Sequence, residues 1–169
     1  MADLNNDPFI QNQTEVIFKE QDVMKANEIS NYIYWMKSTY TYLHLNLSDS
    51  AKTEIWNQIV GMSEKEINED TMNQFAVSIK NQISDTGYLS SKKRRFLFHK
   101  DLGKDELYIK QITEGKSYEV VFVGIAVILT IAVILGGGKI DISALGFKIK
   151  AELPALAEGI SKLKSLFKE

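Results

Sequence analysis

The amino-acid sequence predicts a mainly α-helical fold with four parts: a small N-terminal helical bundle, one transmembrane helix near the C-terminus, a short β-hairpin and a final amphipathic helix. Three observations lead to this prediction. Apolar residues recur at helical spacing in the first half of the chain. The stretch 120–138 contains no charged residue. Polar and apolar residues then alternate before a last amphipathic pattern begins.

Composition limits the classes of protein to which the chain can belong. It has 169 residues and a net charge of −2, so length suggests one domain and charge gives no overall signal for nucleic acid. The absence of cysteine excludes disulfides, thiolate metal sites and a cysteine nucleophile. The acidic N-terminus lacks the basic and apolar segments of a cleaved signal peptide.

The first half of the chain carries the helical pattern. Residues 1–14 are polar and are expected to form a loose arm, and residues 15–90 are predicted to form a cytoplasmic helical bundle. Ser48 begins an N-cap cluster for a second helix, and Ser63 with Glu66 matches a capping box. The first helix carries an apolar face made of Ile29, Ile33, Met36, Tyr40 and Leu43, widened by Tyr32, Trp35 and Tyr42.

Residues 91–118 are predicted to be a basic connector beside the membrane. The positive run consists of Lys92, Lys93, Arg94 and Arg95. These cations suit anionic lipid headgroups, at about 1 kcal/mol each, or the phosphate of a nucleotide or RNA. The second interpretation is the weaker one because no aromatic platform is evident around the run, and a solvated loop fits the pattern equally well. For residues 105–113 a short helix is preferred over a strand.

Residues 119–138 are predicted to form the transmembrane helix. The charge-free stretch reads VVFVGIAVILTIAVILGGG, and about 20 helical residues cross a hydrocarbon core of about 30 Å. β structure is the alternative, because IAVIL occurs at 125–129 and 131–135 and a six-residue repeat keeps its faces only in a strand. A lone strand in lipid leaves backbone groups unpaired, which favours the helix. The span residues singled out are Val120, Phe122, Gly124, Ile128, Thr130, Ile134 and Gly138.

Small residues at a spacing of four within this span predict contact between neighbouring helices. They are Ala126 with Thr130 and Ala132 with Gly136. More lysines precede the span than follow it, which predicts a single-pass protein with a cytoplasmic N-terminal domain.

Residues 139–169 are predicted to form the hairpin and the amphipathic helix. Polar and apolar residues alternate at 139–143 and 147–152, on either side of Gly146. A lone hairpin is marginal in water, so it would need the membrane surface, another domain or neighbouring copies to hold it. A disordered or merely turn-like tail is the alternative. The last helix has an apolar face from Leu153 to Phe167 and a basic end, which suits a membrane surface or a protein partner equally.

No catalytic or cofactor motif occurs, and the two histidines, His44 and His99, lie in different segments. The chain is therefore expected to be non-enzymatic and without a cofactor.

The predicted function is a single-span scaffold that uses the bilayer as anchor and binds its own copies or a protein partner, with nucleic acid and nucleotide ranked low. The alternative is a membrane-permeabilising effector or pore component gated by the helical domain. The layout resembles small bacterial membrane proteins with a soluble domain and a short hydrophobic part, some of them defence effectors.

Overall fold

The computed structural model describes the chain in several stretches separated by gaps. They are residues 9–18, 26–63, 74, 77–79, 91–114, 118–136, 139–142, 148–153 and 161. The strands with assigned bounds are β1 (Gln11–Phe18), β2 (Tyr108–Glu114), β3 (Tyr118–Ile125), β4 (Lys139–Ile142) and β5 (Lys148–Leu153). The helices with assigned bounds are α1 (Ala26–Asn46), α2 (Asp49–Ser63), α4 (Ser91–His99), α5 (Ala126–Leu135) and a short 3-10 helix, η3 (Gly103–Asp105).

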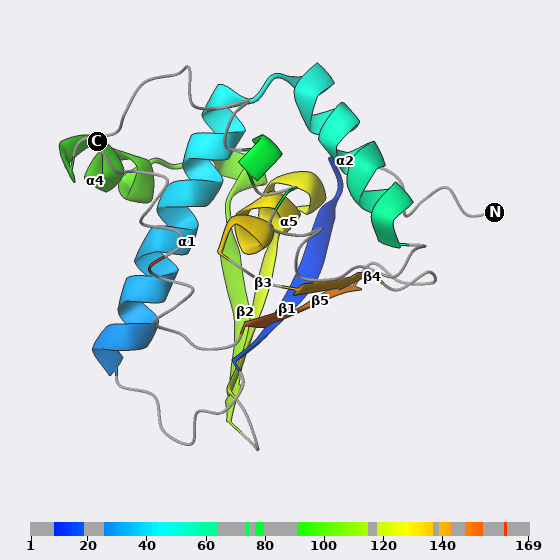
Figure 1. Cartoon of the computed structure of the whole chain (residues 1–169). Coiled ribbons are helices and arrows are strands. Elements are labelled where there is room, and N and C mark those ends of the chain that lie inside the picture. The colour runs from blue at the N-terminus through cyan, green and yellow to red at the C-terminus, as the bar shows by residue number, and fades with distance from the viewer. Residues whose placement is uncertain are drawn as a thin grey trace.

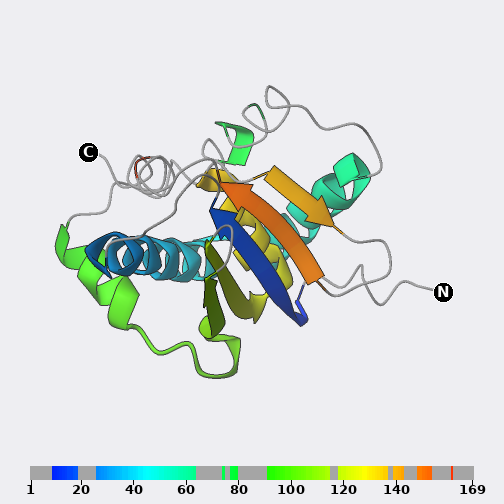
Figure 2. The ribbon, with the colours of Figure 1, turned by 90° about the horizontal axis from the view of Figure 1, so that it is seen from below.

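The five strands form one mixed sheet in the order β2-β3-β1-β5-β4. The first strand of the chain therefore lies in the centre, antiparallel to β3 and parallel to β5 (Figure 2). The polarity of residues 11–14 predicts an arm, but these residues begin β1. Thr14 and Val16 are buried there, which is the alternation of a strand with one covered face.

The predicted hairpin is confirmed, in a different setting from the one expected. β4 pairs antiparallel with β5, and Ile140 lies opposite Ala151. The hairpin is not isolated, because β5 also pairs with β1 and so continues the central sheet. The amphipathic helix predicted after it lies outside the described residues, apart from Leu153 in β5 and a helical Ser161.

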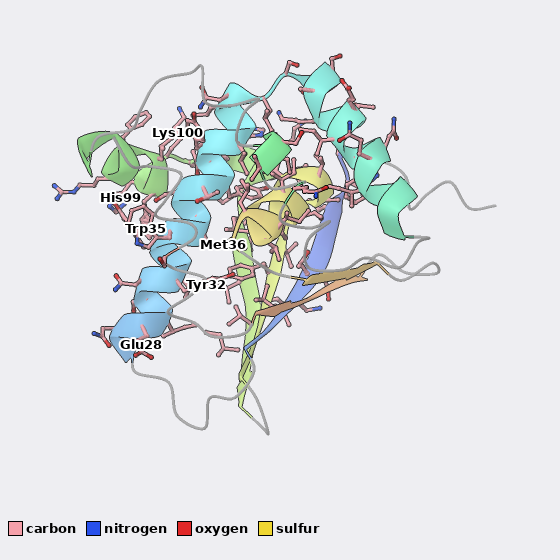
Figure 3. All side chains as sticks on the ribbon, in the orientation of Figure 1. Glu28, Tyr32, Trp35, Met36, His99 and Lys100 are labelled. Carbon is pink, nitrogen blue, oxygen red and sulfur yellow. The ribbon has the colours of Figure 1, made fainter. Side chains whose placement is uncertain are left out.

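Helix α1, which was predicted from its apolar stripe, is confirmed and packs beside the sheet. Tyr32, Met36, Tyr40 and Leu43 are buried along it. Figure 3 shows Tyr32 and Met36 projecting from α1 toward the strands, and the ring of Tyr32 lies 6.3 Å from that of Phe122 in β3. The predicted second helix is observed as α2.

The transmembrane prediction is wrong, because the apolar stretch is divided between a strand and a helix. Val120 to Ile125 belong to β3, which pairs with β1 on one side and β2 on the other. These strands supply the backbone hydrogen-bond partners that an isolated strand in lipid would lack. The β-branched residues of β3 also favour a strand within a sheet. α5 has only 10 residues, about 15 Å of helix.

Among the described residues, no helix combines the length and the apolar character needed to cross a bilayer. The span, the single-pass arrangement and the membrane localisation are therefore corrected. So is the fold class: helices account for more of the described chain than strands do, but they pack against a sheet instead of forming a separate bundle.

All the residues of α5 are buried, which explains why it has no polar face. It contacts α1 and α2 on one side and β1, β3 and β4 on the other (Figure 1). The fold itself therefore provides the apolar surroundings that the sequence pattern attributed to lipid.

The segment 105–113 is also corrected. A short helix was preferred there, but η3 ends at Asp105 and Tyr108 starts β2. β2 pairs antiparallel with β3, with a register shift between Ile109 and Gln111. The backbone partner on β3 decides the conformation, since the apolar spacing of this segment fits both structures.

Candidate functional site

The residues assigned to the membrane lie in the interior of the fold. Val120 and Phe122 are fully buried in β3, and Ile128, Thr130 and Ile134 are buried in α5. The Thr130 hydroxyl donates a 2.6 Å hydrogen bond to the Ala126 carbonyl, so this polar group is satisfied within its own helix. Gly138 lies outside the described residues.

The small residues predicted to contact a neighbouring helix are also enclosed. Ala126, Thr130, Ala132 and Gly136 are buried in the monomer. They let α5 approach its own sheet and helices, and they are not accessible to a second copy.

Tyr40 fixes the point where β3 changes into α5. Its hydroxyl accepts a hydrogen bond from the Ile125 N–H at 2.9 Å and donates one to the Asp105 carbonyl at 2.6 Å. Gly124 gives it room, because a Cβ at that position would lie 3.0 Å from Tyr40. Burial raises the pKa of the Tyr40 phenol, so the hydroxyl stays protonated.

Charged groups on the same helix hold the segment that leads into β2. Lys37 pairs with Glu106 at 2.5 Å and also donates to the Lys100 carbonyl. Burial acts to raise the pKa of Glu106, but hydrogen bonds from Lys37 and from the Leu102 and Leu107 amides outweigh it and lower the pKa overall.

His44 completes this row on α1. Its Nε2 lies 3.6 Å from an Asp105 carboxylate oxygen. Burial, followed by the charge of Lys52, lowers the pKa of His44, and its buried Nδ1 has no hydrogen-bond partner among the residues that the structure describes. The neutral imidazole is the form that suits this position.

These contacts hold the segment that leads into β2. Both hydrogen bonds of the Tyr40 hydroxyl go to main-chain groups. Within the described stretches, no cluster of histidine and carboxylate side chains has the makings of a metal site. We therefore assign the row Lys37–Tyr40–His44 to positioning of the chain that enters β2.

Strand β2 is the first of two surface features that suggest a function. It lies at the edge of the described sheet, and Tyr108, Ile109 and Ile112 are between 40% and 54% exposed. Several of the exposed large apolar residues of the described chain thus gather on one strand. The apolar spacing of residues 105–113 predicts a helix instead, so this exposed strand could not be found from the sequence.

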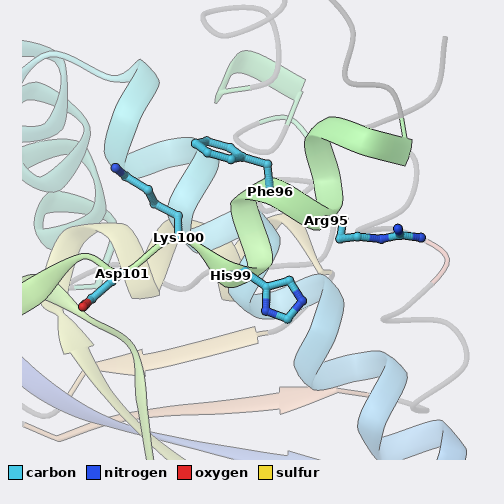
Figure 4. A pocket seen from close by; sticks show the side chains of 5 residues that line it. All are labelled: Arg95, Phe96, His99, Lys100 and Asp101. Carbon is cyan, nitrogen blue, oxygen red and sulfur yellow. The ribbon is translucent and has the colours of Figure 1, made fainter.

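The basic run is the second surface feature. Lys92, Lys93 and Arg94 lie in the first part of α4, so a helix replaces the solvated loop considered from the sequence. Arg95 is exposed and lines an open pocket of about 550 Å³ with Phe96, His99, Lys100 and Asp101 (Figure 4). Phe96 is 60% exposed.

Comparison of the chain with protein-family models, with curated proteins and with solved structures found no match. The β2 edge and the α4 pocket are therefore the features from which a function is inferred.

Proposed function

We propose that this chain is a non-enzymatic association module that extends its sheet by pairing β2 with β2 of a second copy. The observation that carries this proposal is the concentration of exposed apolar side chains on an edge strand, from Tyr108 to Ile112. An edge strand presents unpaired N–H and C=O groups, and proteins that avoid such pairing blunt the edge with charges or proline. β2 has no proline and only one lysine, Lys110.

The sequence of β2 is complementary to itself. In an antiparallel pair centred on Ile112, Ile112 lies opposite its own copy, and Lys110 lies opposite Glu114 on both sides. Opposite charges and apolar side chains that face each other across strands both favour pairing. This charge complementarity is the reason for choosing a second copy as the occupant of the edge.

The anchored segment before β2 supports the same proposal. Lys37 and Tyr40 hold Glu106 and Asp105, and Ile109 and Gln111 then continue a ladder with β3. A strand fixed at its start and along one side loses little conformational entropy when a second strand is added.

Cysteine crosslinking tests the proposal directly, because the chain contains no cysteine. In the proposed pair the two Cα atoms at position 112 are about 4.5–5.5 Å apart, within the range of about 4.4–6.8 Å that a disulfide spans. Ile112→Cys is therefore expected to form a covalent dimer under mild oxidation, seen on a non-reducing gel.

Ile109→Cys is the matched control. It is exposed like Ile112 but lies three positions away, so its two copies are about 20 Å apart in this register. Little crosslinking is expected from it. Equal crosslinking of both variants contradicts the register, and a monomeric mass for the unmodified chain by light scattering at high concentration contradicts self-association.

A further inference from the structure

We propose that the pocket at the end of α4, lined by Arg95, Phe96, His99, Lys100 and Asp101, binds a nucleotide unit, with its phosphate on Lys100 and its base on Phe96. This site is independent of the β2 edge and goes beyond association. From the sequence, nucleotide binding ranked low because no aromatic platform was evident. The exposed ring of Phe96 supplies that platform.

The way α4 packs explains why these side chains face outward. Leu97 is buried, and the ring of Phe98 lies 5.1 Å from that of Tyr34 on α1. This fixes the rotation of α4 and leaves Arg95, Phe96 and His99 exposed, and Lys100 is exposed directly after the helix ends. Figure 4 shows the Phe96 and Lys100 side chains projecting to the same side, whereas Arg95 and His99 point away from them.

The charges at the pocket favour an anion. Arg95 and Lys100 are exposed, and no ion pair of either is found among the described residues. The single carboxylate, Asp101, is engaged, because its Oδ1 accepts a hydrogen bond from the Gly103 N–H at 2.9 Å. Three further cations precede Arg95 on the same helix, at positions 92–94. Arginine and lysine are the side chains that proteins use most for phosphate.

The aromatic ring distinguishes a nucleotide from a simple anion. A phenylalanine with 60% of its surface exposed, on the same side as Lys100, can stack a base while the lysine contacts the phosphate. The open pocket, about 550 Å³, has the size typical of small-ligand sites. A free nucleotide and a nucleotide within single-stranded RNA share this chemistry.

Calorimetric titration of the full chain tests the assignment with four probes: ATP, inorganic triphosphate, adenosine and a short single-stranded oligoribonucleotide. We expect Lys100→Gln to weaken ATP binding about 10-fold through loss of a phosphate contact. Phe96→Leu is expected to weaken ATP binding by a similar factor, through loss of stacking, and to leave triphosphate binding unchanged. Because Phe96 and Lys100 are exposed, both variants should retain the circular dichroism spectrum of the parent chain.

Lys104→Gln is the matched control, since Lys104 is an exposed cation on η3 and does not line the pocket. It should leave the affinity for ATP unchanged. Tighter binding of the oligoribonucleotide than of ATP assigns the site to RNA, and the reverse order assigns it to free nucleotides. Absence of binding by both at millimolar concentration overturns the proposal. So does triphosphate binding as tight as ATP binding, or an equal loss in Lys104→Gln and Lys100→Gln.

Discussion

Helix α5 and strand β2 show how differently apolar residues are placed in this molecule. α5 is apolar except for Thr130 and is fully enclosed, whereas β2 mixes polar with apolar residues and exposes Tyr108, Ile109 and Ile112 at the sheet edge. A charge-free stretch therefore establishes that the segment avoids water, but it does not establish whether lipid or protein replaces the water. Conversely, Ile112 lies in a segment that mixes polar and apolar residues, and its side chain is exposed.

The largest expected difference in stability comes from placing the same residue, aspartate, in each of the two regions. Ile128→Asp places a carboxylate among buried apolar groups of α5 and should cost about 4 kcal/mol or more, enough to unfold the chain. Ile112→Asp, on exposed β2, should change stability by less than about 0.5 kcal/mol. Urea denaturation followed by circular dichroism measures both, and similar losses from the two variants would remove the contrast.

Tyr40→Phe tests the contact that joins the two regions. It removes a hydroxyl that bonds to Ile125 at the start of α5 and to Asp105 before β2. An unpaired buried amide costs about 1–3 kcal/mol, so we expect a loss in that range. The urea midpoint should fall without a change in slope. A midpoint equal to that of the parent chain would show that Tyr40 contributes packing alone.

Gly124→Ala tests the space beside the same hydroxyl. The added Cβ would lie 3.0 Å from Tyr40 and would push the ring away from Ile125. Overpacking of this kind costs about 1–3 kcal/mol, and we expect the lower end because a side chain can shift more easily than backbone. Thermal unfolding measures the loss. An unchanged melting temperature would mean that α1 moves freely relative to β3.

The smallest expected effect concerns His44, beside the segment that enters β2. Its folded pKa lies below the ordinary value of 6.5, so the unfolded chain binds the proton more strongly. Stability should therefore fall as pH drops from 7 through 6.5 toward the folded pKa, because protonation favours the unfolded state. His44→Gln should flatten this slope in urea midpoints measured between pH 7 and pH 5.5. A slope that persists in the variant would assign it to other groups.

Features specified by neighbouring residues were predictable from the sequence, and features specified by distant ones were not. The apolar stripe of α1 and the alternation in β4 and β5 are local patterns, and both elements form as expected. β2 and β3 depend on pairing partners, β1 included, that lie far away in the sequence.

The pentapeptide IAVIL shows the limit most clearly. Its second copy, at 131–135, lies wholly in α5, while the first begins with Ile125, the last residue of β3. The point of change is set by Tyr40 and by the Ile10 carbonyl, which accepts a hydrogen bond from the Ala126 N–H at 2.8 Å. The basic run was visible in the sequence, but the exposure of Phe96 depends on how α4 packs against α1.

The enclosure of α5 is tested most directly by thiol labelling of the cysteine-free chain in buffer without detergent. Val127→Cys introduces a thiol at a fully buried position of similar volume, and Leu45→Cys introduces one at a position that is 49% exposed. We predict that a water-soluble maleimide labels Leu45→Cys at once and labels Val127→Cys only after urea is added. Equal labelling in buffer, or a chain that stays in solution only with detergent, would contradict an α5 enclosed by its own sheet and helices.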